Sequence, residues 1–335
     1  MTKKIAVIGA GSWGTALAMA LTRSRAKHAV SLWVYETDIC ESLRTRRVNE
    51  VFLPGFEVPR EVEATNDFAE ALDGAEIVLG VMPSGHARGL YSKMLPHLKP
   101  EMVFVSATKG LDPATLERIT QVIEQVAGQK FAPRVAALSG PSFAKEVAKG
   151  DPTAVVIASK DLDLARMVQE EFSGPTFRLY ASDDPAGVEL GGAVKNVIAI
   201  AAGVCDGLGF GHNTIAALIT RGLAEMTRLA VSMGGQPKTL AGLAGMGDLV
   251  LTCTGGLSRN RTVGVELGKG RKLEEIVGSM RMVAEGVGTT VATMQLAKKM
   301  NVEMPITEQM HAVLYEGKAP KDAIRELMER RLKHE

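Results

Sequence analysis

Hydrophobic and polar positions alternate with two different periods along the first half of the chain. Short apolar runs rich in β-branched residues are separated by stretches in which apolar residues recur every three or four positions. The runs predict strands and the intervening stretches predict helices, an order that is typical of a doubly wound parallel sheet with helices on both faces. Strands are expected at residues 5–8, 30–35, 77–81, 103–106, 135–138 and 154–158, and helices at 15–24, 67–72 and 113–126.

Beyond about residue 187 the helical period continues with almost no β-branched runs between its segments. This pattern predicts an all-α second domain that follows a Rossmann-like α/β domain. We place the division at residues 1–186 and 187–335. Helices are expected at residues 188–208, 213–233, 238–243, 273–278, 289–299, 306–316 and 320–333.

The composition argues against several classes of function. The formal net charge of the 335 residues is +1 and aromatic residues make up 4%, so the chain lacks the positive field and stacking surface of a nucleic-acid binder. The longest apolar stretch, residues 197–205, is much shorter than the roughly 20 residues of a membrane span. Cys40, Cys205 and Cys253 show no metal-ligand spacing, so no metal is expected and a cytoplasmic location fits best.

The segment IAVIGAGSWGTALAMAL joins a predicted strand, three glycines and a predicted helix. Gly9, Gly11 and Gly14 have the G-x-G-x-x-G spacing, and Glu36 follows 22 positions later at the end of the next predicted strand. In a dinucleotide-binding turn these glycines permit the tight turn, the approach of the pyrophosphate and the packing of helix on strand. The alternative is a glycine turn without a ligand, but the strand, the helix and the acidic residue together favour a dinucleotide.

Glu36 bears on which dinucleotide is bound. A carboxylate here accepts hydrogen bonds from the ribose hydroxyls of NAD(H) and repels the 2′-phosphate of NADP(H), so we favour NAD(H). Arg44, Arg46 and Arg47 follow shortly afterwards and offer the alternative of a grip for that phosphate. We interpret them instead as part of a solvated helix face.

Two polar stretches follow predicted strands, at the edge where open α/β sheets bind ligands. Lys109 lies in VSATKG after the strand at 103–106, and LSGPSFAK follows the strand at 135–138. In the second stretch Gly140 predicts a turn and Ser142 predicts an N-cap for the next helix. A solvated lysine and a simple helix cap are the alternatives to substrate contacts here.

Lys195 lies near the start of the most apolar predicted helix, in GGAVKNVIAIAAG. Burial disfavours an ammonium ion, so it lowers the pKa of a lysine and makes the neutral amine a usable general base near neutral pH. The alternative is a lysine that extends from the helix end to solvent.

Two further stretches carry polar groups in the second half. Asp248 follows two glycines in AGMGDL, and SRNR places Ser258 as an N-cap with Arg259 and Asn260 in the first helical turn. Basic and amide donors at a helix N-terminus suit a phosphate group. An ordinary capped helix with surface arginines is the alternative.

In their order and spacing these motifs resemble those of the NAD(P)-dependent glycerol-3-phosphate dehydrogenase family. The resemblance covers essentially the whole chain, through GAGSWGTALA, LPG, SATKG, LSGPSFAKEVA, GGAVKNVIAIAAG, AALITRGLAEM, AGMGDL, SRNR and VAEGV. It implies a helical second domain of the 6-phosphogluconate-dehydrogenase type. It also implies reversible hydride transfer between NAD(P)H and dihydroxyacetone phosphate, giving sn-glycerol 3-phosphate for glycerophospholipid synthesis.

The resemblance assigns expected roles to individual residues. Lys195 is the expected proton acceptor and donor. The substrate is expected to contact Lys109, Gly140, Ser142, Lys195, Asp248, Ser258, Arg259 and Asn260. The cofactor is expected to contact Gly9, Gly11, Ser12, Trp13, Gly14, Tyr35, Glu36, Phe52, Lys109, Ala144, Arg259, Val283 and Glu285.

One segment departs from the bacterial pattern of the family. Bacterial members commonly have an arginine near the end of the second strand in a Trp-Gly-Arg context, whereas this chain has Trp33-Val-Tyr-Glu36. The departure puts an NADPH preference in doubt and agrees with the charge of Glu36.

Two other functions share parts of the pattern. A dehydrogenase for an unphosphorylated hydroxy acid has the same two-domain plan, and the phosphate-suited turn at residues 258–260 argues against it. A dinucleotide sensor needs neither a buried base at Lys195 nor a second lysine at Lys109. The apolar helical half and the resemblance together predict a homodimer.

Overall fold

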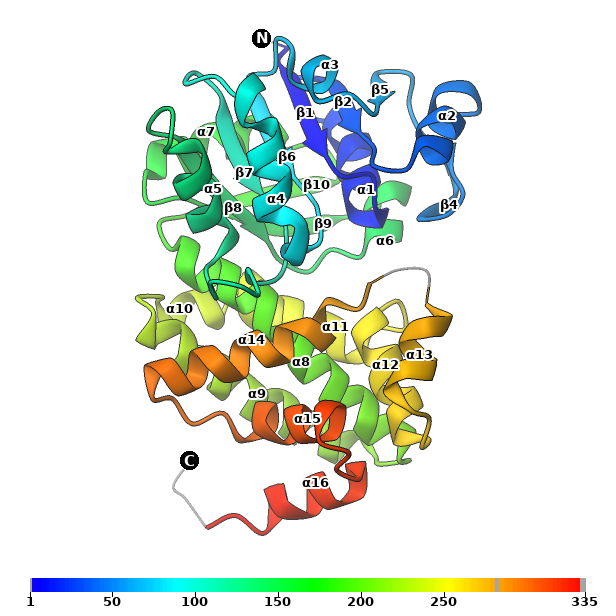
Figure 1. The fold of residues 1–335 in the computed structure, drawn as a ribbon, viewed down its shortest axis with the longest axis vertical. Helices are drawn as coiled ribbons and strands as arrows, with labels where there is room; N and C mark the ends of the chain where they lie inside the picture. Colours follow the sequence, from blue (N-terminus) through cyan, green and yellow to red (C-terminus); the bar gives the residue numbers. More distant parts are fainter. Residues whose placement is uncertain (1, 281–282, 332–335) are drawn as a thin grey trace.

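The computed structural model describes residues 2–280 and 283–331, which form two unlike halves (Figure 1). The upper half in Figure 1 contains a β-sheet with helices on both faces, and the lower half consists of helices. The Rossmann-like first half followed by an all-α second half confirms the fold class predicted from the sequence.

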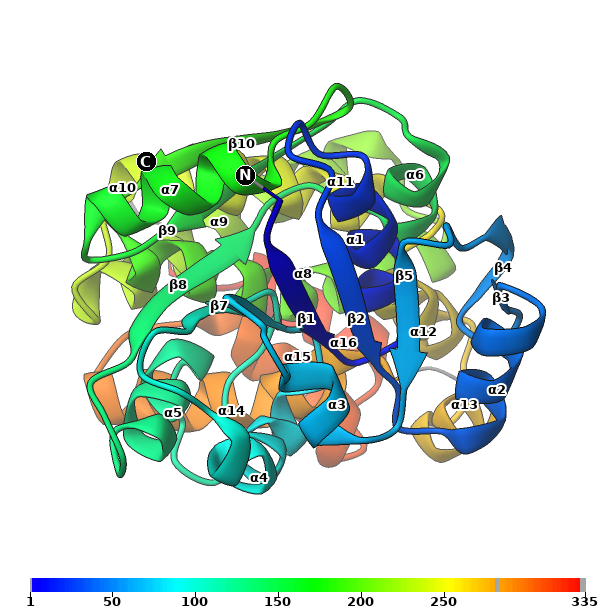
Figure 2. The same ribbon diagram turned by 90° about the horizontal axis from the view of Figure 1, so that it is seen from above.

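Within the described residues one sheet has the strand order β10–β9–β8–β7–β6–β1–β2–β5. The chain runs outward from β1 in one direction and from β6 in the other, so the strand order reverses between these two neighbours. Figure 2 shows β1, β2 and β5 side by side and parallel. The strands are β1 (Lys4–Ile8), β2 (Ala29–Trp33), β5 (Val62–Thr65), β6 (Ile77–Gly80), β7 (Val103–Ser106), β8 (Arg134–Ser139), β9 (Thr153–Ala158) and β10 (Phe177–Ser182).

All six predicted strands are confirmed, with ends that differ by at most two residues. The prediction missed the edge strands β5 and β10 and the separate antiparallel pair β3 (Val48–Asn49) and β4 (Leu53–Glu57). The edge strands β5 and β10 contain exposed residues between buried ones, and β4 contains Pro54 and Gly55. None of these three strands shows the continuous apolar run that marks a buried parallel strand.

The sheet is not wholly parallel, because β8 and β9 pair antiparallel. Helix α6 (Ala144–Lys149) is the only helix between them within the described chain, and its six residues span about 9 Å. The six residues of β8 extend about 20 Å. The helix is therefore too short to return the chain to the start of the sheet, and β9 begins at the edge where β8 ends.

Helices cover both faces of the sheet. One core joins the sheet to α1 (Ser12–Thr22), α2 (Thr37–Thr45), α6 and α7 (Leu162–Phe172), and another joins it to α3 (Phe68–Leu72), α4 (Ser84–Met94) and α5 (Ile119–Ala127). The helix predicted at residues 113–126 begins only at Ile119. Residues 111–118 form a turn instead, closed by a bridge between Leu111 and Arg118.

The second half contains the predicted helices, among them the helix expected after Ser258, α12 (Arg259–Gly268), and two further helical segments. The additional segments are a π-helix, η2 (Leu243–Gly247), and the helix α11 (Asp248–Thr254). The helix predicted at 320–333 ends at Met328, and residues 332–333 lie outside the described part of the chain. The others are α8 (Pro185–Gly207), α9 (His212–Ser232), α10 (Pro237–Leu240), α13 (Leu273–Ser279), α14 (Glu285–Met300), α15 (Pro305–Tyr315) and α16 (Pro320–Met328).

Helix α8 is the central element of the second half and runs diagonally through it in Figure 1. It is long and apolar enough to cross a membrane, but its most apolar window is entirely buried inside the structure, as in the core helix of a globular domain. Glycines bring α12 close, because a Cβ at Gly203 would lie 2.0 Å from the Arg261 carbonyl oxygen and one at Gly264 would lie 2.0 Å from that of Ile200.

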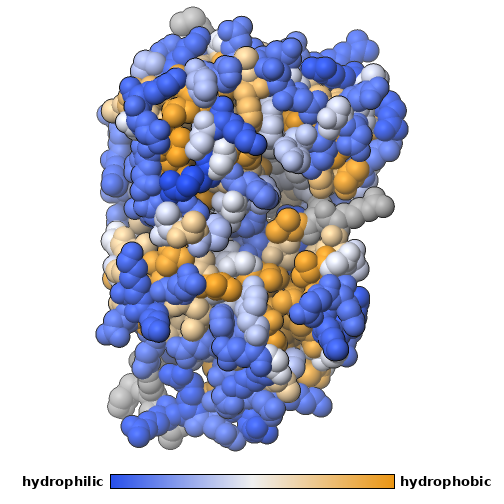
Figure 3. Space-filling model, viewed as in Figure 1, coloured by the Kyte–Doolittle hydropathy of each residue, from blue (hydrophilic) through white to orange (hydrophobic). Residues whose placement is uncertain are grey.

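The space-filling view shows how polarity is distributed over one face of the molecule. Apolar residues gather around its middle, where the two halves meet, and the two ends are mostly hydrophilic (Figure 3). The division we predicted at residue 186 falls in the first turn of α8, whose N-cap is Asp184.

Candidate functional site

The three glycines of the first turn have different surroundings. Gly9 has a φ of +116°, and a Cβ there would lie 2.5 Å from the carbonyl oxygen of Val81. At Gly14 a Cβ would lie 1.8 Å from the Gly9 carbonyl oxygen, so α1 packs directly on the end of β1. A Cβ at Gly11 would meet nothing within 4 Å. Gly9 and Gly14 are therefore tightly packed, whereas Gly11 faces open space. This arrangement leaves room for a pyrophosphate at the N-terminus of α1.

A buried asparagine ties the loop after β3 to this turn. The Asn49 side chain donates to the Ala10 carbonyl oxygen over 2.8 Å and accepts from the Phe52 amide over 3.0 Å. The Ser12 hydroxyl donates to the Phe52 carbonyl oxygen over 2.5 Å. Ser12, Trp13 and Phe52, predicted cofactor contacts far apart in sequence, therefore lie around one turn.

Tyr35 and Glu36 lie where β2 ends. Tyr35 is 74% exposed, and Glu36 is half-buried at the N-cap position of α2, where its side chain makes no capping hydrogen bond. The end of β2 lies beside the glycine turn, since β1 and β2 are paired and the Gly9 amide donates to the Trp33 carbonyl oxygen over 3.1 Å.

The three arginines of the alternative phosphate site are occupied in different ways. Arg47 donates to the carbonyl oxygens of Val58, Pro59 and Val62. Arg44 donates to Ala64, and Arg46 pairs with Glu50 on the surface. Arg47 in particular holds the segment before β5 and is not directed as a free phosphate ligand.

Lys109 is bound at the carboxyl edge of the sheet, just after β7. Its Nζ donates to the Gly140 carbonyl oxygen over 2.8 Å and to Asp248 Oδ2 over 2.7 Å, and it lies 3.4 Å from Ser142 Oγ. The prediction that Ser142 caps the next helix is wrong. The N-cap position of α6 is Phe143, and the Ser142 hydroxyl donates instead to the Gly140 carbonyl oxygen over 2.9 Å.

Lys195 lies in the middle of α8, with only 5% of its surface exposed. Its Nζ donates to Asp248 Oδ1 over 2.6 Å and to the Thr252 hydroxyl over 2.8 Å. Thr252 in turn donates to the Asp248 carbonyl oxygen over 2.6 Å. Asp248 is 1% exposed and receives one lysine on each carboxylate oxygen. We call Lys109, Lys195, Asp248 and Thr252 the lysine–aspartate cluster.

Burial lowers the pKa of Lys195 to about 8. Loss of hydration is the largest cause, and the positive charge of Lys109 adds to it, while Asp248 acts in the opposite direction. The lowering effect of burial is the one expected from the sequence, whereas the net direction of the pKa shift could not be predicted there because Asp248 opposes it. The predicted position of Lys195 near the start of its helix differs from the structure. Helix α8 begins at Pro185 and places Lys195 about midway along its length, where the side chain cannot extend to solvent.

Small residues let the elements of the cluster approach one another. A Cβ at Gly191 would lie 2.5 Å from the Ala244 carbonyl oxygen, and one at Gly192 would lie 2.5 Å from Ser139 Oγ. Helix α8 therefore packs against both the end of β8 and the π-helix that precedes Asp248. A π-helix at this point is a feature that recurs at functional sites.

A chain of amides connects α8 with the helices α12 and α14. Asn260 Nδ2 donates to Asn196 Oδ1 over 2.9 Å, and Asn260 Oδ1 accepts from the Gly286 amide over 2.9 Å. Ser258 caps α12 as predicted, since its Oγ accepts from the Arg261 amide over 3.2 Å. The turn at 258–260 is thereby fixed relative to Asn196, the neighbour of Lys195.

Glu285 joins the two halves at the start of α14. Its carboxylate accepts from the Ser84 hydroxyl over 2.9 Å and from the Ser84 amide over 3.3 Å, at the start of α4. Burial raises the pKa of Glu285, and Arg259 is among the charges that lower it. Arg259 itself is exposed, as is Val283 at 56%, and Ala144 is the half-buried first residue of α6.

The structure thus brings Lys109, Gly140, Ser142, Lys195 and Asp248 into one hydrogen-bonded group. Three polar residues that hold this region were not predicted from the sequence: Thr252, Asn196 and Ser84. Thr252 lies four positions after Asp248, so a helix from Asp248 onward puts both on one face and was the available signal. Nothing in the sequence marks the pairing of Ser84 with Glu285. Within residues 2–280 and 283–331, no group of three or more His, Cys, Asp or Glu residues could hold a metal ion.

Family models and known proteins match this chain over almost its whole length. Family models described as NAD-dependent glycerol-3-phosphate dehydrogenase N-terminus and C-terminus match residues 4–165 and 184–325. Glycerol-3-phosphate dehydrogenase [NAD(P)+] from Koribacter versatilis is 65% identical over 328 residues, which cover 98% of this chain and 97% of that protein. The same enzyme from Citrifermentans bemidjiense is 56% identical over 335 residues, covering 100% and 99% of the two chains.

A solved structure agrees with these relatives. The 2.1 Å crystal structure of glycerol-3-phosphate dehydrogenase from Coxiella burnetii is 42% identical in sequence and superposes with a TM-score of 0.93. The match covers 98% of this chain and 99% of that one.

Proposed function

The chain belongs to the NAD-dependent glycerol-3-phosphate dehydrogenase family, and from this premise we propose that the lysine–aspartate cluster is its catalytic centre. The protein is an NAD(P)-dependent oxidoreductase that interconverts dihydroxyacetone phosphate and sn-glycerol 3-phosphate. The observation that carries the catalytic proposal is the shared carboxylate of Asp248, with the buried Lys195 on one oxygen and the partly buried Lys109 on the other.

Lys195 has the properties that a proton-transfer group needs in this reaction. The nicotinamide cofactor, when bound, accepts or supplies the hydride. In the oxidative direction the neutral amine of Lys195 takes the proton of the substrate's secondary hydroxyl, and in the reductive direction its ammonium returns that proton. A pKa of about 8 keeps both forms populated near neutral pH.

Lys109 and Asp248 set the balance between these two forms. Lys109 disfavours a second positive charge on Lys195, and Asp248 favours it, so the pair holds the amine between its charged and neutral states. Thr252 accepts one hydrogen bond from Lys195 and fixes the direction of its nitrogen. Positioning of this kind supplies rate in addition to the proton transfer itself.

For the substrate, we propose that Lys109, Gly140, Ser142 and Asp248 contact the triol. The capped turn of Ser258, Arg259 and Asn260 would hold its phosphate end. The amide chain from Asn260 to Asn196 supports this assignment, because it ties the phosphate position to the residue beside Lys195. Exposed Arg259 at the start of α12 provides the cationic group.

The glycine turn fits a dinucleotide, and we propose that NAD(H) is preferred over NADP(H). Gly11 leaves open space at an N-terminus with no side-chain cap in the described chain, and Trp13 and Ser12 lie beside it. Glu36 at the end of β2 favours a ribose diol. We assign Tyr35, Phe52, Ala144, Val283 and Glu285 to the walls of the same site.

Replacement of Lys195 tests the catalytic proposal. In Lys195→Met, turnover of dihydroxyacetone phosphate should fall at least about 10²-fold, while the dissociation constant of NADH changes less than about threefold. The matched control is Lys321→Met, which removes an exposed lysine of α16. Turnover of Lys195→Met within tenfold of the parent would overturn the role of Lys195. Loss of NADH binding together with turnover would also leave that role unsupported.

Initial rates with NADH and NADPH test the cofactor preference. We expect a higher kcat/KM with NADH and a shift toward NADPH in Glu36→Gln. A parent enzyme that favours NADPH would contradict the assignment and redirect attention to Arg44 and Arg46.

The same proposal extends to the setting of the enzyme. We propose that residues 1–186 and 187–335 act as a cofactor domain and a substrate domain, that the protein is a cytoplasmic homodimer, and that its product supplies glycerophospholipid synthesis. A matched test of the competing hydroxy-acid function is turnover of the unphosphorylated analogue dihydroxyacetone, which should be negligible.

A further inference from the structure

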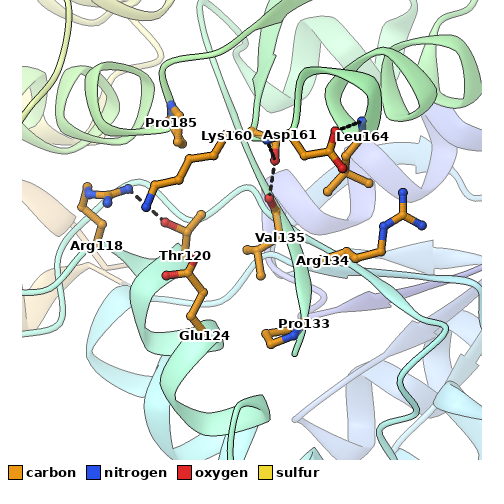
Figure 4. Close-up of a pocket in the computed structure, with 11 residues that line it drawn as sticks. Arg118, Thr120, Glu124, Pro133, Arg134, Val135, Lys160, Asp161, Leu164 and Pro185 are labelled. Carbon is orange, nitrogen blue, oxygen red and sulfur yellow. Dashed lines mark hydrogen bonds between the residues drawn. The ribbon is translucent and has the colours of Figure 1, made fainter. Parts of the chain in front are cut away.

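A cavity of about 260 Å³ lies where α5, the start of β8 and the first turns of α7 and α8 meet (Figure 4). None of the residues assigned above to catalysis, substrate or cofactor lines it. The lining residues are Arg118, Thr120, Glu124, Pro133, Arg134, Val135, Ser159, Lys160, Asp161, Leu164 and Pro185.

The cationic side chains that line this cavity outnumber the carboxylates that line it. Three are cationic and two are acidic, and one of the acids, Asp161, uses its carboxylate to accept from the Asp163 and Leu164 amides at the start of α7. Within the described residues, the side chains of Lys160 and Arg134 make no ion pair or hydrogen bond. Glu124 is the remaining carboxylate of the lining.

Lys160 extends across the cavity toward Arg118 and Thr120 (Figure 4). Arg118 is buried, with 8% of its surface exposed, and its Nη1 donates to Glu189 Oε2 over 2.6 Å and to Thr120 Oγ1 over 3.1 Å. Glu189 compensates the charge of Arg118 from α8, outside the lining. The ammonium of Lys160 is then an additional positive charge, with no carboxylate partner in the described residues, that approaches the guanidinium of Arg118.

We propose that this cavity binds a small phosphate monoester, with Lys160 and the outer guanidinium nitrogens of Arg118 as its cationic groups. A dianionic phosphate can accept from both groups at once, which relieves the approach of two like charges. The volume suits a small polar molecule and is below the range of drug-sized sites. Arg134, at the start of β8, also lines the cavity, but its guanidinium is directed away from Lys160 and Arg118 (Figure 4).

The position of the cavity links it to α8. Arg118 is shared between the cavity and Glu189, and Lys195 follows Glu189 by six residues on the same helix, about 9 Å along its axis. A ligand at Arg118 therefore contacts the residue that binds Glu189 in the first part of α8, the helix that carries Lys195. The site is nevertheless distinct from the proposed phosphate position at residues 258–260.

Equilibrium dialysis with glycerol 2-phosphate tests the proposal on the full chain. The Arg259→Gln variant is the starting point, because it weakens the proposed catalytic phosphate position and leaves the cavity unchanged. We expect this variant to bind one equivalent. Adding Lys160→Met should weaken that binding at least tenfold, adding Lys321→Met should leave it unchanged, and neutral glycerol should not compete.

Two results would overturn the proposal: no binding by Arg259→Gln, or equal affinity with and without Lys160. Orthophosphate in the same assay distinguishes the source of affinity, since equal binding means that the phosphate group alone is recognised and weaker binding means that the alcohol part contributes. Lys160→Met alone should keep turnover within about twofold of the parent. The outcome is independent of Lys195, so failure of the catalytic assignment would not be mistaken for failure of this site.

Discussion

The glycine turn and the lysine–aspartate cluster are two ways to build a binding surface at the same edge of one sheet. The turn is made by six consecutive residues, and its function depends on the absence of side chains. The cluster collects side chains from the loop after β7, from α8 and from α11, and Lys109 and Lys195 lie 139 and 53 residues from Asp248 in sequence. The glycine turn depends on shape and the lysine–aspartate cluster depends on charge. Substitutions in the turn should therefore change cofactor binding, and substitutions in the cluster should change the rate of the reaction.

Asp248→Asn should separate the two regions most strongly. Removal of the carboxylate removes the charge that favours protonated Lys195, so the amine loses its proton at lower pH and the reductive direction loses its acid. We expect kcat for reduction at pH 7 to fall about 10²-fold, with NADH affinity unchanged. Stopped-flow reduction and NADH fluorescence titration measure the two quantities, and a parallel loss of both would show that the regions are not independent.

The pH dependence should follow the cluster alone. Oxidation needs the neutral amine of Lys195, so its rate should rise about tenfold per pH unit below about 8 and level off above it. Reduction needs the ammonium, so its rate should be level below about pH 8 and fall above it. NADH affinity should stay flat across this range. A reductive rate that rises through pH 8 would contradict the assignment.

Two neighbouring glycines sharpen the comparison within the turn. Gly14→Ala places a methyl group against the Gly9 carbonyl and should lower the free energy of unfolding by at least about 2 kcal/mol, as overpacking does. Gly11→Ala meets no protein atom within 4 Å, so it should leave stability unchanged and weaken NADH binding about tenfold. Urea unfolding and NADH titration on both variants give the result. Unchanged NADH affinity in Gly11→Ala would place the pyrophosphate elsewhere.

Thr252→Val should have the smallest effect. The variant keeps the shape of the side chain and removes one hydrogen bond to Lys195, a loss of about 1 kcal/mol or about fivefold in kcat. Steady-state rates measure this change, and Thr252→Ser, which keeps the hydroxyl, is the matched control. A serine variant as impaired as the valine variant would argue for packing rather than orientation of the amine.

The same contrast explains why the glycine turn could be predicted from the sequence more fully than the lysine–aspartate cluster. The turn was predicted residue by residue, because its strand, glycines and helix are contiguous and each residue type has one steric reason to be there. Lys195 and Asp248 were each singled out, but their bond through one carboxylate depends on how α8 packs against α11. The antiparallel β9 and the displaced cap at Phe143 were mispredicted because each depends on the length of a short connection, which periodicity does not specify.

The burial of α8 has a consequence for synthesis of the chain. Its 23 residues leave the ribosome before α12 and α14, the helices that cover it, exist. Until about residue 300 has emerged, a segment apolar enough to enter a membrane lacks the surfaces of α12 and α14 that complete its burial. The first half can complete its sheet early, whereas the second must protect its core helix from aggregation until its last helices arrive. Slowed translation after residue 207 should therefore increase aggregation of the nascent chain more than slowing before residue 185.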